Sequence, residues 1–367
     1  MFILSLETSC DETAAAVLES TAAGFSLLSD VVSSQVALHA KWGGVVPNLA
    51  AREHLKNMLP VVEQALREAS VNQSDISLIA VTNGPGLIPA LLVGVGAAKT
   101  LSYLWQVPLI GIHHIEGHIY ANFIHQTKTE EITFPILCLV VSGGHTQLVL
   151  MKKHLDYEIV GETLDDAAGE AFDKVARILD LGYPGGPAIS AIAEEFRISN
   201  LEFRIKSGLE NSKLSLPRPM INSKDFNFSF SGLKTAVLYK FRSLSKNLPS
   251  DKKELLVTEL AAEFQAATVE VLTKKTMAAA KKYGVKTVML AGGVSANMEL
   301  RKCLAAKVAA ELENVNCVLP DIKYSGDNAA MIGAAAHFRY HATQDKNSWQ
   351  DNWKNLETDA NLKLKNQ

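Results

Sequence analysis

Two stretches of the chain share one hydrophobic pattern: an apolar run, a short turn of small and polar residues, and a second apolar run. The first stretch spans residues 2–18 (FILSLETSCDETAAAVL), and the second spans residues 136–151 (ILCLVVSGGHTQLVLM). Apolar runs separated by such a turn are typical of β-hairpins. Because the same hairpin pattern recurs far along the chain, it predicts a duplicated fold.

Helical and strand patterns alternate in the rest of the chain. Residues 47–69 carry apolar side chains at helical spacing, and residues 261–283 form another strongly helical run. Short apolar runs at 77–82, 107–112 and 287–291 predict buried strands. Glycine-containing turns lead from the first and last of these strands into helices. Alternation of this kind predicts an α/β fold.

The length of 367 residues favours two lobes over one core. We expect an N-terminal lobe at 1–134, a C-terminal lobe at 135–340 and a polar tail at 341–367. Within the second lobe, the more charged stretch 194–225 is expected to leave the repeating core. The tail contains an apolar stripe at helical spacing that should pack on the body, formed by Trp349, Trp353 and Leu356.

The composition, 47% hydrophobic and 20% charged, is that of an ordinary soluble globular protein. The net charge of −3 gives no global positive field, so an RNA partner would need a local basic patch or a second subunit. Paired lysines at 252–253, 274–275 and 281–282 are interpreted as solvated helix faces. The four cysteines lack metal or redox spacing. The start of the chain lacks a signal-peptide pattern, and the apolar stretch 87–98 is too short to span a bilayer, so we expect a cytoplasmic protein without a membrane segment.

The most specific chemical pattern is His114-Ile115-Glu116-Gly117-His118. Histidines four residues apart share one face of a helix, so His114 and His118 can bind one metal ion. Glu116 points elsewhere, whereas the metalloprotease signature needs its glutamate directly after the first histidine. A histidine pair in the core or facing solvent would have the same spacing. Asp327 is the candidate third ligand, and capping of the last helix is an equally good interpretation of this residue.

Glycine turns lie at the second hairpin (Gly143-Gly144), at the start of a helix (Gly185-Gly186) and after a strand (Gly292-Gly293). Backbone N–H groups in such turns can bind a phosphate, and together the turns predict a nucleotide cleft between the lobes. Each turn alone could be purely structural. Neither a Walker A nor a GxGxxG pattern occurs in the sequence.

Three acidic residues are further candidates. Asp11 and Glu12, in the turn of the first hairpin, could hold a water or accept a proton, or could simply be solvated. Asp173 could bond ribose hydroxyls, or could pair with Lys174 or Arg177 on its own helix.

Together these motifs closely resemble the TsaD family, over about residues 1–340. The matching strings are ETSCDET at 7–13, GGVVPNLAAREH at 43–54, GPGL at 84–87, HHIEGH at 113–118, VSGGHTQL at 141–148, DDAAGEAFDKVARIL at 165–179, YPGGP at 183–187, FSFSGLKT at 228–235 and AGGVSAN at 291–297. The histidine in SGGHTQ resembles the bacterial or mitochondrial branch, and the lack of a transit-peptide pattern favours the bacterial branch. Residues 194–213 and the tail after Tyr340 depart from the family pattern.

The resemblance implies an ASKHA (actin-like ATPase) fold, with two duplicated lobes around a nucleotide cleft. The implied activity is an acyl transfer: threonylcarbamoyl passes from threonylcarbamoyl-AMP to N6 of adenosine 37 in tRNAs that read ANN codons, and AMP is released. The implied partners are tRNA, a TsaB-like paralogue and a TsaE-like ATPase, with a homodimer when the chain is isolated.

The resemblance also assigns roles to single residues. His114, His118 and Asp327 would bind one divalent metal ion per subunit, Fe²⁺ in preference to Zn²⁺. Asp11 and Glu12 would be catalytic. The adenylate, or AMP or ATP in its place, would be held by Val140, Val141, Ser142, Gly143, Gly144, Asp173, Gly186 and Asn297.

Three rival functions stay open at this point. A metallopeptidase would show proteolysis that depends on His114. A non-catalytic nucleotide-binding scaffold would hold no metal. A sugar or acetate kinase of the same fold would transfer phosphate from ATP.

Overall fold

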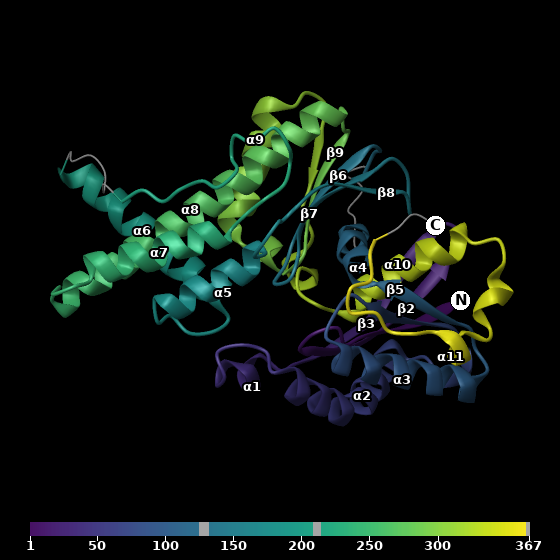
Figure 1. Cartoon of the computed structure of the whole chain (residues 1–367). Coiled ribbons are helices and arrows are strands. Elements are labelled where there is room, and N and C mark those ends of the chain that lie inside the picture. The colour runs from purple at the N-terminus through teal and green to yellow at the C-terminus, as the bar shows by residue number, and fades with distance from the viewer. Residues whose placement is uncertain (125–131, 208–213, 365–367) are drawn as a thin grey trace. The chain divides into compact units, whose positions relative to one another are not determined.

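The computed structural model describes residues 1–124, 132–207 and 214–364, which form two compact units (Figure 1). Unit 1 comprises residues 1–132, 151–158 and 318–367, and unit 2 comprises residues 133–150 and 159–317. The chain therefore leaves unit 1 after residue 132, rejoins it briefly at 151–158 while it builds unit 2, and returns to it at residue 318.

Unit 1 is built on a five-stranded sheet with the order β3-β2-β1-β4-β5. The strands are β1 (Phe2–Glu7), β2 (Glu12–Thr21), β3 (Gly24–Ser34), β4 (Ile76–Gly84) and β5 (Leu109–His113). The first three strands are antiparallel, whereas β1, β4 and β5 run parallel. Because β1, β4 and β5 are parallel, their carboxyl ends, including Glu7 and His113, lie at one edge of the sheet.

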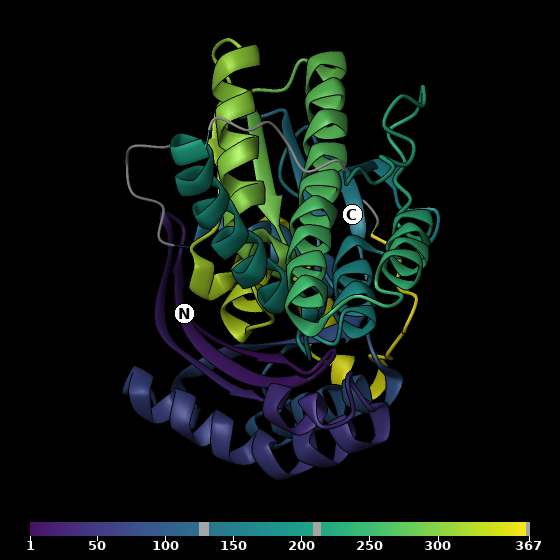
Figure 2. The ribbon, with the colours of Figure 1, turned by 90° about the vertical axis from the view of Figure 1, so that its left-hand side faces the viewer.

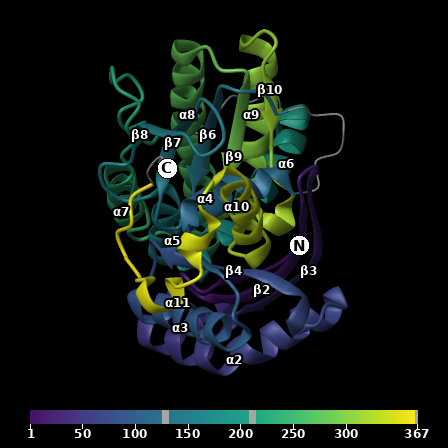
Figure 3. The ribbon, with the colours of Figure 1, turned by 90° about the vertical axis from the view of Figure 1, so that its right-hand side faces the viewer.

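Helices cover both faces of this sheet. On one face lie α2 (Pro47–Ala69) and α3 (Ile88–Trp105), and on the other lies α10 (Ala329–Ala342) (Figure 3). A Cβ on Gly333 of α10 would meet Leu18 Cδ1 at 2.1 Å, so the helix approaches the sheet closely here. The short helices of the unit are α1 (Val36–Ala40), α4 (His114–Tyr120) and α11 (Asn352–Asn355).

Unit 2 has a second five-stranded sheet, with the order β10-β9-β6-β7-β8. Its strands are β6 (Ile136–Val141), β7 (Thr146–Met151), β8 (Tyr157–Glu162), β9 (Thr287–Ala291) and β10 (Asn316–Val318). Its helices are α5 (Ala168–Ile178), α6 (Gly185–Ser207), α7 (Ser231–Leu244), α8 (Ser250–Tyr283) and α9 (Met298–Glu311). The long helix α8, green in Figure 2, packs against α6 and α9.

The predicted duplication is confirmed by the strand orders. Counted from its own first strand, each sheet has the order third, second, first, fourth, fifth. The two repeated hydrophobic patterns form β1–β2 and β6–β7, the first two strands of each sheet. The predicted helix at 47–69 and the predicted strand at 287–291 have the bounds of α2 and β9.

Three boundaries differ from the prediction. Residues 318–340 belong to unit 1 rather than to the C-terminal lobe, because α10 packs on β1, β2 and β3. Helix α8 begins at Ser250, before the predicted start at 261. The sequence pattern did not reveal its first turns because they are largely exposed and lack the apolar spacing of a packed helix. The proposed excursion at 194–225 begins as a continuation of α6 to Ser207, and its residues 208–213 lie outside the described residues.

The C-terminal tail packs on unit 1, as predicted, but not as one helix. Trp353 and Leu356 pack against the core of unit 1, while the Trp349 ring lies 6.0 Å from that of Tyr340. Trp349 ends a short 3-10 helix and Trp353 lies in α11, so the predicted single stripe is divided between two segments.

Among the described residues, α3 alone is long and apolar enough to cross a membrane. It spans 18 residues, so the prediction that the apolar segment was shorter was wrong. Packing explains part of its composition, because Val95, Ala98 and Leu101 belong to the core of unit 1. The Thr8 hydroxyl donates to the Ala90 carbonyl at 3.0 Å, which joins α3 to the end of β1.

Candidate functional site

His114 and His118 are positioned by the start of helix α4. His113 ends β5 and caps the helix: its Nδ1 accepts from the Ile115 N–H at 3.1 Å. Its other ring nitrogen, Nε2, donates to the Leu362 carbonyl at 3.0 Å, which fixes the ring. His114 and His118 follow one helical turn apart and are both buried.

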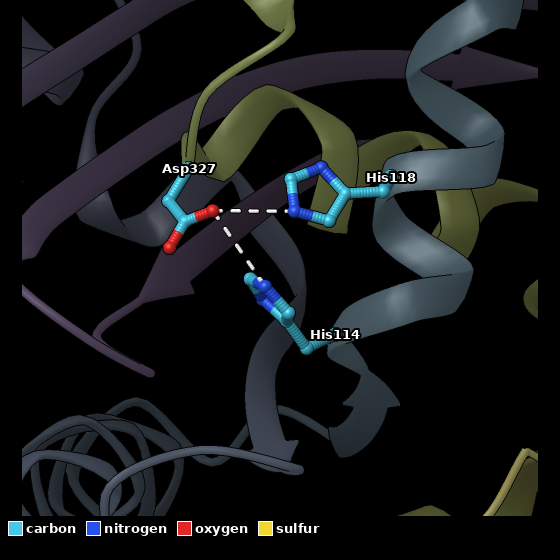
Figure 4. Close-up of side chains that lie close together, drawn as sticks. All are labelled: His114, His118 and Asp327. Carbon is cyan, nitrogen blue, oxygen red and sulfur yellow. Dashed lines mark ion pairs between the residues drawn. The ribbon is translucent and has the colours of Figure 1, made fainter. Parts of the chain in front are cut away.

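The structure brings Asp327 to the same two imidazoles (Figure 4). Asp327 Oδ1 lies 3.2 Å from His118 Nε2 and 3.6 Å from His114 Nε2. One ligand atom from each of the three residues falls within a group whose members lie within 4.8 Å of one another. All three residues belong to unit 1.

Asp327 does not cap the last helix, so that interpretation of the sequence was wrong. Asn328 is the cap of α10: its Oδ1 accepts from the Met331 N–H at 2.9 Å, and its Nδ2 donates to the Gly326 carbonyl at 2.8 Å. Because the next residue satisfies the helix end, the Asp327 carboxylate is directed at the histidines.

The donor set fits a divalent metal ion. A tetrahedral ion with ligands at about 2.0–2.1 Å separates its donor atoms by roughly 3.4 Å, and the two nitrogen–oxygen separations here are 3.2 and 3.6 Å. His118 Nε2 is buried and faces Asp327 Oδ1 at 3.2 Å, outside good hydrogen-bond geometry. Such an orphaned imidazole nitrogen is rare in a folded protein unless a ligand completes it.

Sequence reasoning missed Glu7, which supports the site from behind. Glu7 is fully buried at the end of β1, and its Oε2 lies 3.2 Å from His114 Nδ1. The Ser9 N–H and the Thr82 hydroxyl also donate to this carboxylate. Donation from His114 Nδ1 to Glu7 leaves the Nε2 lone pair for a ligand, the usual arrangement behind a metal-bound histidine. An acid at the buried carboxyl end of a strand was the available signal.

The charges of these groups are coupled. Burial opposes the charged form of His114, but Asp327 and Glu7 outweigh it and raise the pKa of His114 to about 9. Burial also works to raise the pKa of Glu7, but His114 holds that pKa below its usual value. Burial lowers the pKa of His118. The site therefore favours a positive charge beside the carboxylates of Glu7 and Asp327. A bound metal ion would supply such a charge.

Asp11 and Glu12 lie in the same unit: Asp11 is in the turn between β1 and β2, and Glu12 is the first residue of β2. Burial, followed by the charges of Asp327 and Asp11, raises the pKa of Glu12 to about 9. The Ser34 hydroxyl donates to Glu12 at 3.0 Å. His54 Nε2 lies 3.1 Å from the Cys10 carbonyl oxygen and orders the turn. The catalytic roles of both acids stay predictions.

A separate cavity of about 580 Å³ lies within unit 2. Four of the predicted adenylate residues line it: Gly143, Asp173, Gly186 and Asn297. Phe172, Pro187 and Val294 give it apolar walls, and Ser190, Glu194 and Gln265 add polar groups. A mostly apolar cavity with a few convergent polar groups is the usual form of a small-molecule site.

Two of these residues also have structural duties. Asp173 Oδ1 accepts from the Gly185 N–H at 2.8 Å, at the start of α6. Asn297 caps α9 by accepting from the Leu300 N–H at 2.9 Å, while its Nδ2 donates to Ser190 and Gln265. The side chain of Asn297 therefore shapes the cavity wall through bonds within the protein.

The glycines of the predicted phosphate turns fall into two classes. Gly185 and Gly292 are required by packing: a Cβ would meet Asp173 Cα at 2.6 Å and the Val141 carbonyl oxygen at 2.5 Å, respectively. A Cβ on Gly143, Gly186 or Gly293 would meet nothing within 4 Å. Since the protein does not fill that space, a ligand can approach these three backbones closely.

The other four predicted adenylate residues are outside the cavity lining. Val140 and Val141 lie in β6 with fully buried side chains, so only their backbone could reach a ligand. The Ser142 Oγ accepts from the His145 N–H at 3.1 Å and closes the hairpin turn. A Cβ on Gly144 would lie in open space. Ligand contacts by all four stay predictions.

Comparison with known proteins gives matches that cover more than 90% of this chain. A tRNA N6-adenosine threonylcarbamoyltransferase of Bacillus subtilis is 49% identical over 335 residues, which cover 91% of this chain and 89% of the relative. Another enzyme of that name, from Thermosipho africanus, is 47% identical over 365 residues, covering 99% of this chain and 100% of the relative. Among solved structures, full-length HypF in a phosphate- and nucleotide-bound form matches with a TM-score of 0.57 at 12% identity, over 94% of this chain and 47% of that one.

The duplicated sheets and the likeness to HypF place the chain in the ASKHA class of α/β folds. The family model described as "TsaD: tRNA N6-adenosine threonylcarbamoyltransferase" matches residues 26–334. The chain belongs to this family.

Proposed function

We propose that this protein is an acyltransferase that moves threonylcarbamoyl from threonylcarbamoyl-AMP to N6 of adenosine 37 in tRNAs reading ANN codons, with release of AMP. The observation that carries the proposal is similarity along the whole chain, at 47% identity over 365 residues, to an enzyme named for this reaction. The two candidate sites add separate support, since each suits one part of the chemistry.

In this reaction the N6 amine attacks the carbamoyl carbon of a mixed anhydride. A C–N bond forms, the bond from carbon to the phosphate oxygen breaks, AMP leaves, and the amine loses a proton. Holding both reactants in place and stabilising developing charge can supply most of the acceleration, so that no covalent nucleophile is needed.

We assign His114, His118 and Asp327 to one divalent metal ion, Fe²⁺ in preference to Zn²⁺. When bound, such an ion supplies a Lewis acid that polarises a substrate oxygen. Glu7 orients His114 through the bond at Nδ1. Asp11 and Glu12 are assigned to the N6 proton. As a carboxylate, either residue would accept that proton as the amine attacks.

The cavity of unit 2 is assigned to the adenylate, and AMP or ATP can occupy it as well. The open glycines Gly143, Gly186 and Gly293 would allow backbone N–H groups to approach the nucleotide. The cavity's apolar walls, including Phe172, suit a nucleobase.

The metallopeptidase alternative is not favoured. Glu116, the acid of the histidine motif, is buried in an ion pair with Arg339 and cannot act as a base at the triad. A scaffold that holds no metal would leave the convergence of His114, His118 and Asp327 unexplained. A kinase would require phosphate transfer from ATP, which the named relatives do not indicate.

The partners proposed for the reaction are tRNA, a TsaB-like paralogue and a TsaE-like ATPase, and the isolated chain is proposed to form a homodimer. We place the enzyme in the cytoplasm, where its tRNA substrate is available. The weak net charge supports the need for partner subunits that add basic surface.

Mass spectrometry of tRNA nucleosides tests the function directly. Cells that lack this protein should lose threonylcarbamoyladenosine, the wild-type gene should restore it, and a gene encoding His114→Ala should not. Unchanged threonylcarbamoyladenosine in the deletion strain would overturn the proposal.

A further inference from the structure

Glu116, which the proposed reaction leaves without a role, is bound on both oxygens by an arginine from a distant part of the chain. Arg339 Nε donates to Glu116 Oε1 at 2.6 Å, and Arg339 Nη2 donates to Oε2. The Glu116 side chain is fully buried, and that of Arg339 is 12% exposed. Two parallel bonds of this kind fix both the distance and the relative orientation of the groups. We call this pair the clamp.

The clamp joins the two segments that carry the proposed metal ligands. Helix α4 bears His114 and His118, and α10, which bears Arg339, begins directly after Asp327 and its capping neighbour Asn328. Two residues along a helix correspond to a rotation of about 200°. The clamp therefore holds α4 from the side roughly opposite to its histidines.

The packing between these helices leaves little room for adjustment. A Cβ on Gly117 would meet Ile332 Cδ1 at 2.7 Å and Met331 Cγ at 3.2 Å, so α4 lies directly on α10. Helix α4 has only 7 residues, and a helix this short depends on tertiary contacts for its position. Tyr120 of α4 also stacks on Phe338 of α10, with 4.6 Å between the ring centroids. These contacts press the two helices together, and the two-pronged bond adds a directional restraint on their register.

We propose that the Glu116–Arg339 clamp is a positioning device for the metal site: it sets the location of His114 and His118 relative to Asp327. This inference rests on the proposed metal site. A stabilising role alone accounts poorly for the clamp, because well-packed apolar residues can often replace a buried ion pair at no cost in stability. An ion pair that fixes the register of α4 against α10 would, in contrast, also affect the affinity of the site for its metal ion.

The test compares metal affinity with folding stability in four full-length proteins. Glu116→Gln removes the charge of the clamp but keeps its shape, and Arg339→Lys keeps a cation but loses the two-pronged bond. The control is Glu263→Gln in unit 2, which breaks one of the two ion pairs of Arg218 and leaves the other, with Glu270, in place. The side chains of Arg218 and Glu263 are 23% and 19% exposed. Zn²⁺ is the probe, its Kd is measured by competition with a chromophoric chelator, and the unfolding of each metal-free protein is followed by circular dichroism.

Both clamp variants should raise the Kd for Zn²⁺ by about 10- to 100-fold, the range found when groups that orient metal ligands are removed. The control should keep the wild-type Kd even if its metal-free form unfolds at a lower temperature. Arg339→Lys secures the test in the event that Glu116→Gln does not fold.

Wild-type Kd values in the clamp variants, or an equal rise in Kd for the control, would overturn the clamp and leave the metal site intact. A separate His114→Ala/His118→Ala variant distinguishes the other failure. If wild-type protein binds no more Zn²⁺ than that variant, the metal site itself is wrong and the clamp has no function to serve.

Discussion

Replacement of Glu7 by glutamine tests whether the buried carboxylate behind His114 tunes the metal site. Glutamine keeps the size of the side chain and an oxygen that can accept from His114 Nδ1, now 3.2 Å from Glu7 Oε2. It removes the negative charge of Glu7, and Glu7 is one of the two carboxylates that raise the pKa of His114. The imidazole becomes a weaker donor to a metal ion while its position is kept.

The expected loss in metal affinity is about 10- to 100-fold, or roughly 1.4–2.7 kcal/mol of binding free energy. Zn²⁺ titration against a competing chelator measures it, and Glu53→Gln, on α2 with a side chain that is 28% exposed, is the control. With its oxygen at the Oε2 position, glutamine still accepts from the Thr82 hydroxyl and from His114 Nδ1, whereas the Ser9 N–H loses its acceptor. Circular dichroism of the metal-free variant therefore checks that it is folded before its Zn²⁺ affinity is compared. Wild-type Zn²⁺ affinity in a folded Glu7→Gln protein would refute the reasoning that Glu7 acts on the metal through His114.

Four further outcomes are expected. His114→Ala and His118→Ala should each lose most bound metal and most transfer activity, because two ligands hold an ion poorly; a full equivalent of metal in either protein would contradict the assignment. Gly186→Val should fill open cavity space and weaken AMP binding by at least about 10-fold in equilibrium dialysis, whereas Gly232→Val, also in open space but outside the cavity lining, should not. Burial, followed by the charges of His341 and His154, lowers the pKa of His337 to about 4, below its unfolded value of 6.5. The neutral His337 ring therefore contributes fully to folding stability above pH 6.5, and this contribution is lost as the pH falls from 6.5 to 4. Urea titrations at pH 7 and pH 4.5 should show the wild type losing about 1–2 kcal/mol more than His337→Phe, a figure reduced from the full shift because a solvent-facing cavity borders the ring. The isolated chain should bind tRNA weakly with a shallow salt slope, and both should rise when the TsaB-like partner is added; tight, steeply salt-dependent binding by the chain alone would show a basic surface on it.

The sequence predicted those elements whose patterns depend on nearby residues. Helix α2 has its apolar spacing and a proline at its first position, and both hairpins show their turns, so these were placed correctly. The start of α8 was missed because exposed helical turns carry no periodic signal. The metal triad was proposed from the spacing of His114 and His118, but spacing could not decide the part played by Asp327.

Other features of the site depend on contacts between distant segments. Either Asp327 or Asn328 could have capped α10, and the backbone geometry of the folded protein selects Asn328. The support from Glu7 and the Glu116–Arg339 pair bring together residues far apart in the chain. The division of glycines into packed and open positions likewise depends on which backbone lies opposite each one. No local pattern encodes these pairings.

The return of the chain to unit 1 constrains the order in which this protein can mature during synthesis. Helix α4 leaves the ribosome well before residues 318–367, which complete unit 1, and all of unit 2 is made in between. His114 and His118 must therefore wait for Asp327, and the sheet of unit 1 lacks the helix that covers one of its faces until α10 emerges. Domains usually fold as units as they appear, but here the second unit can finish first. A contiguous fragment that ends before residue 318 would accordingly contain a whole unit 2 and an incomplete metal centre.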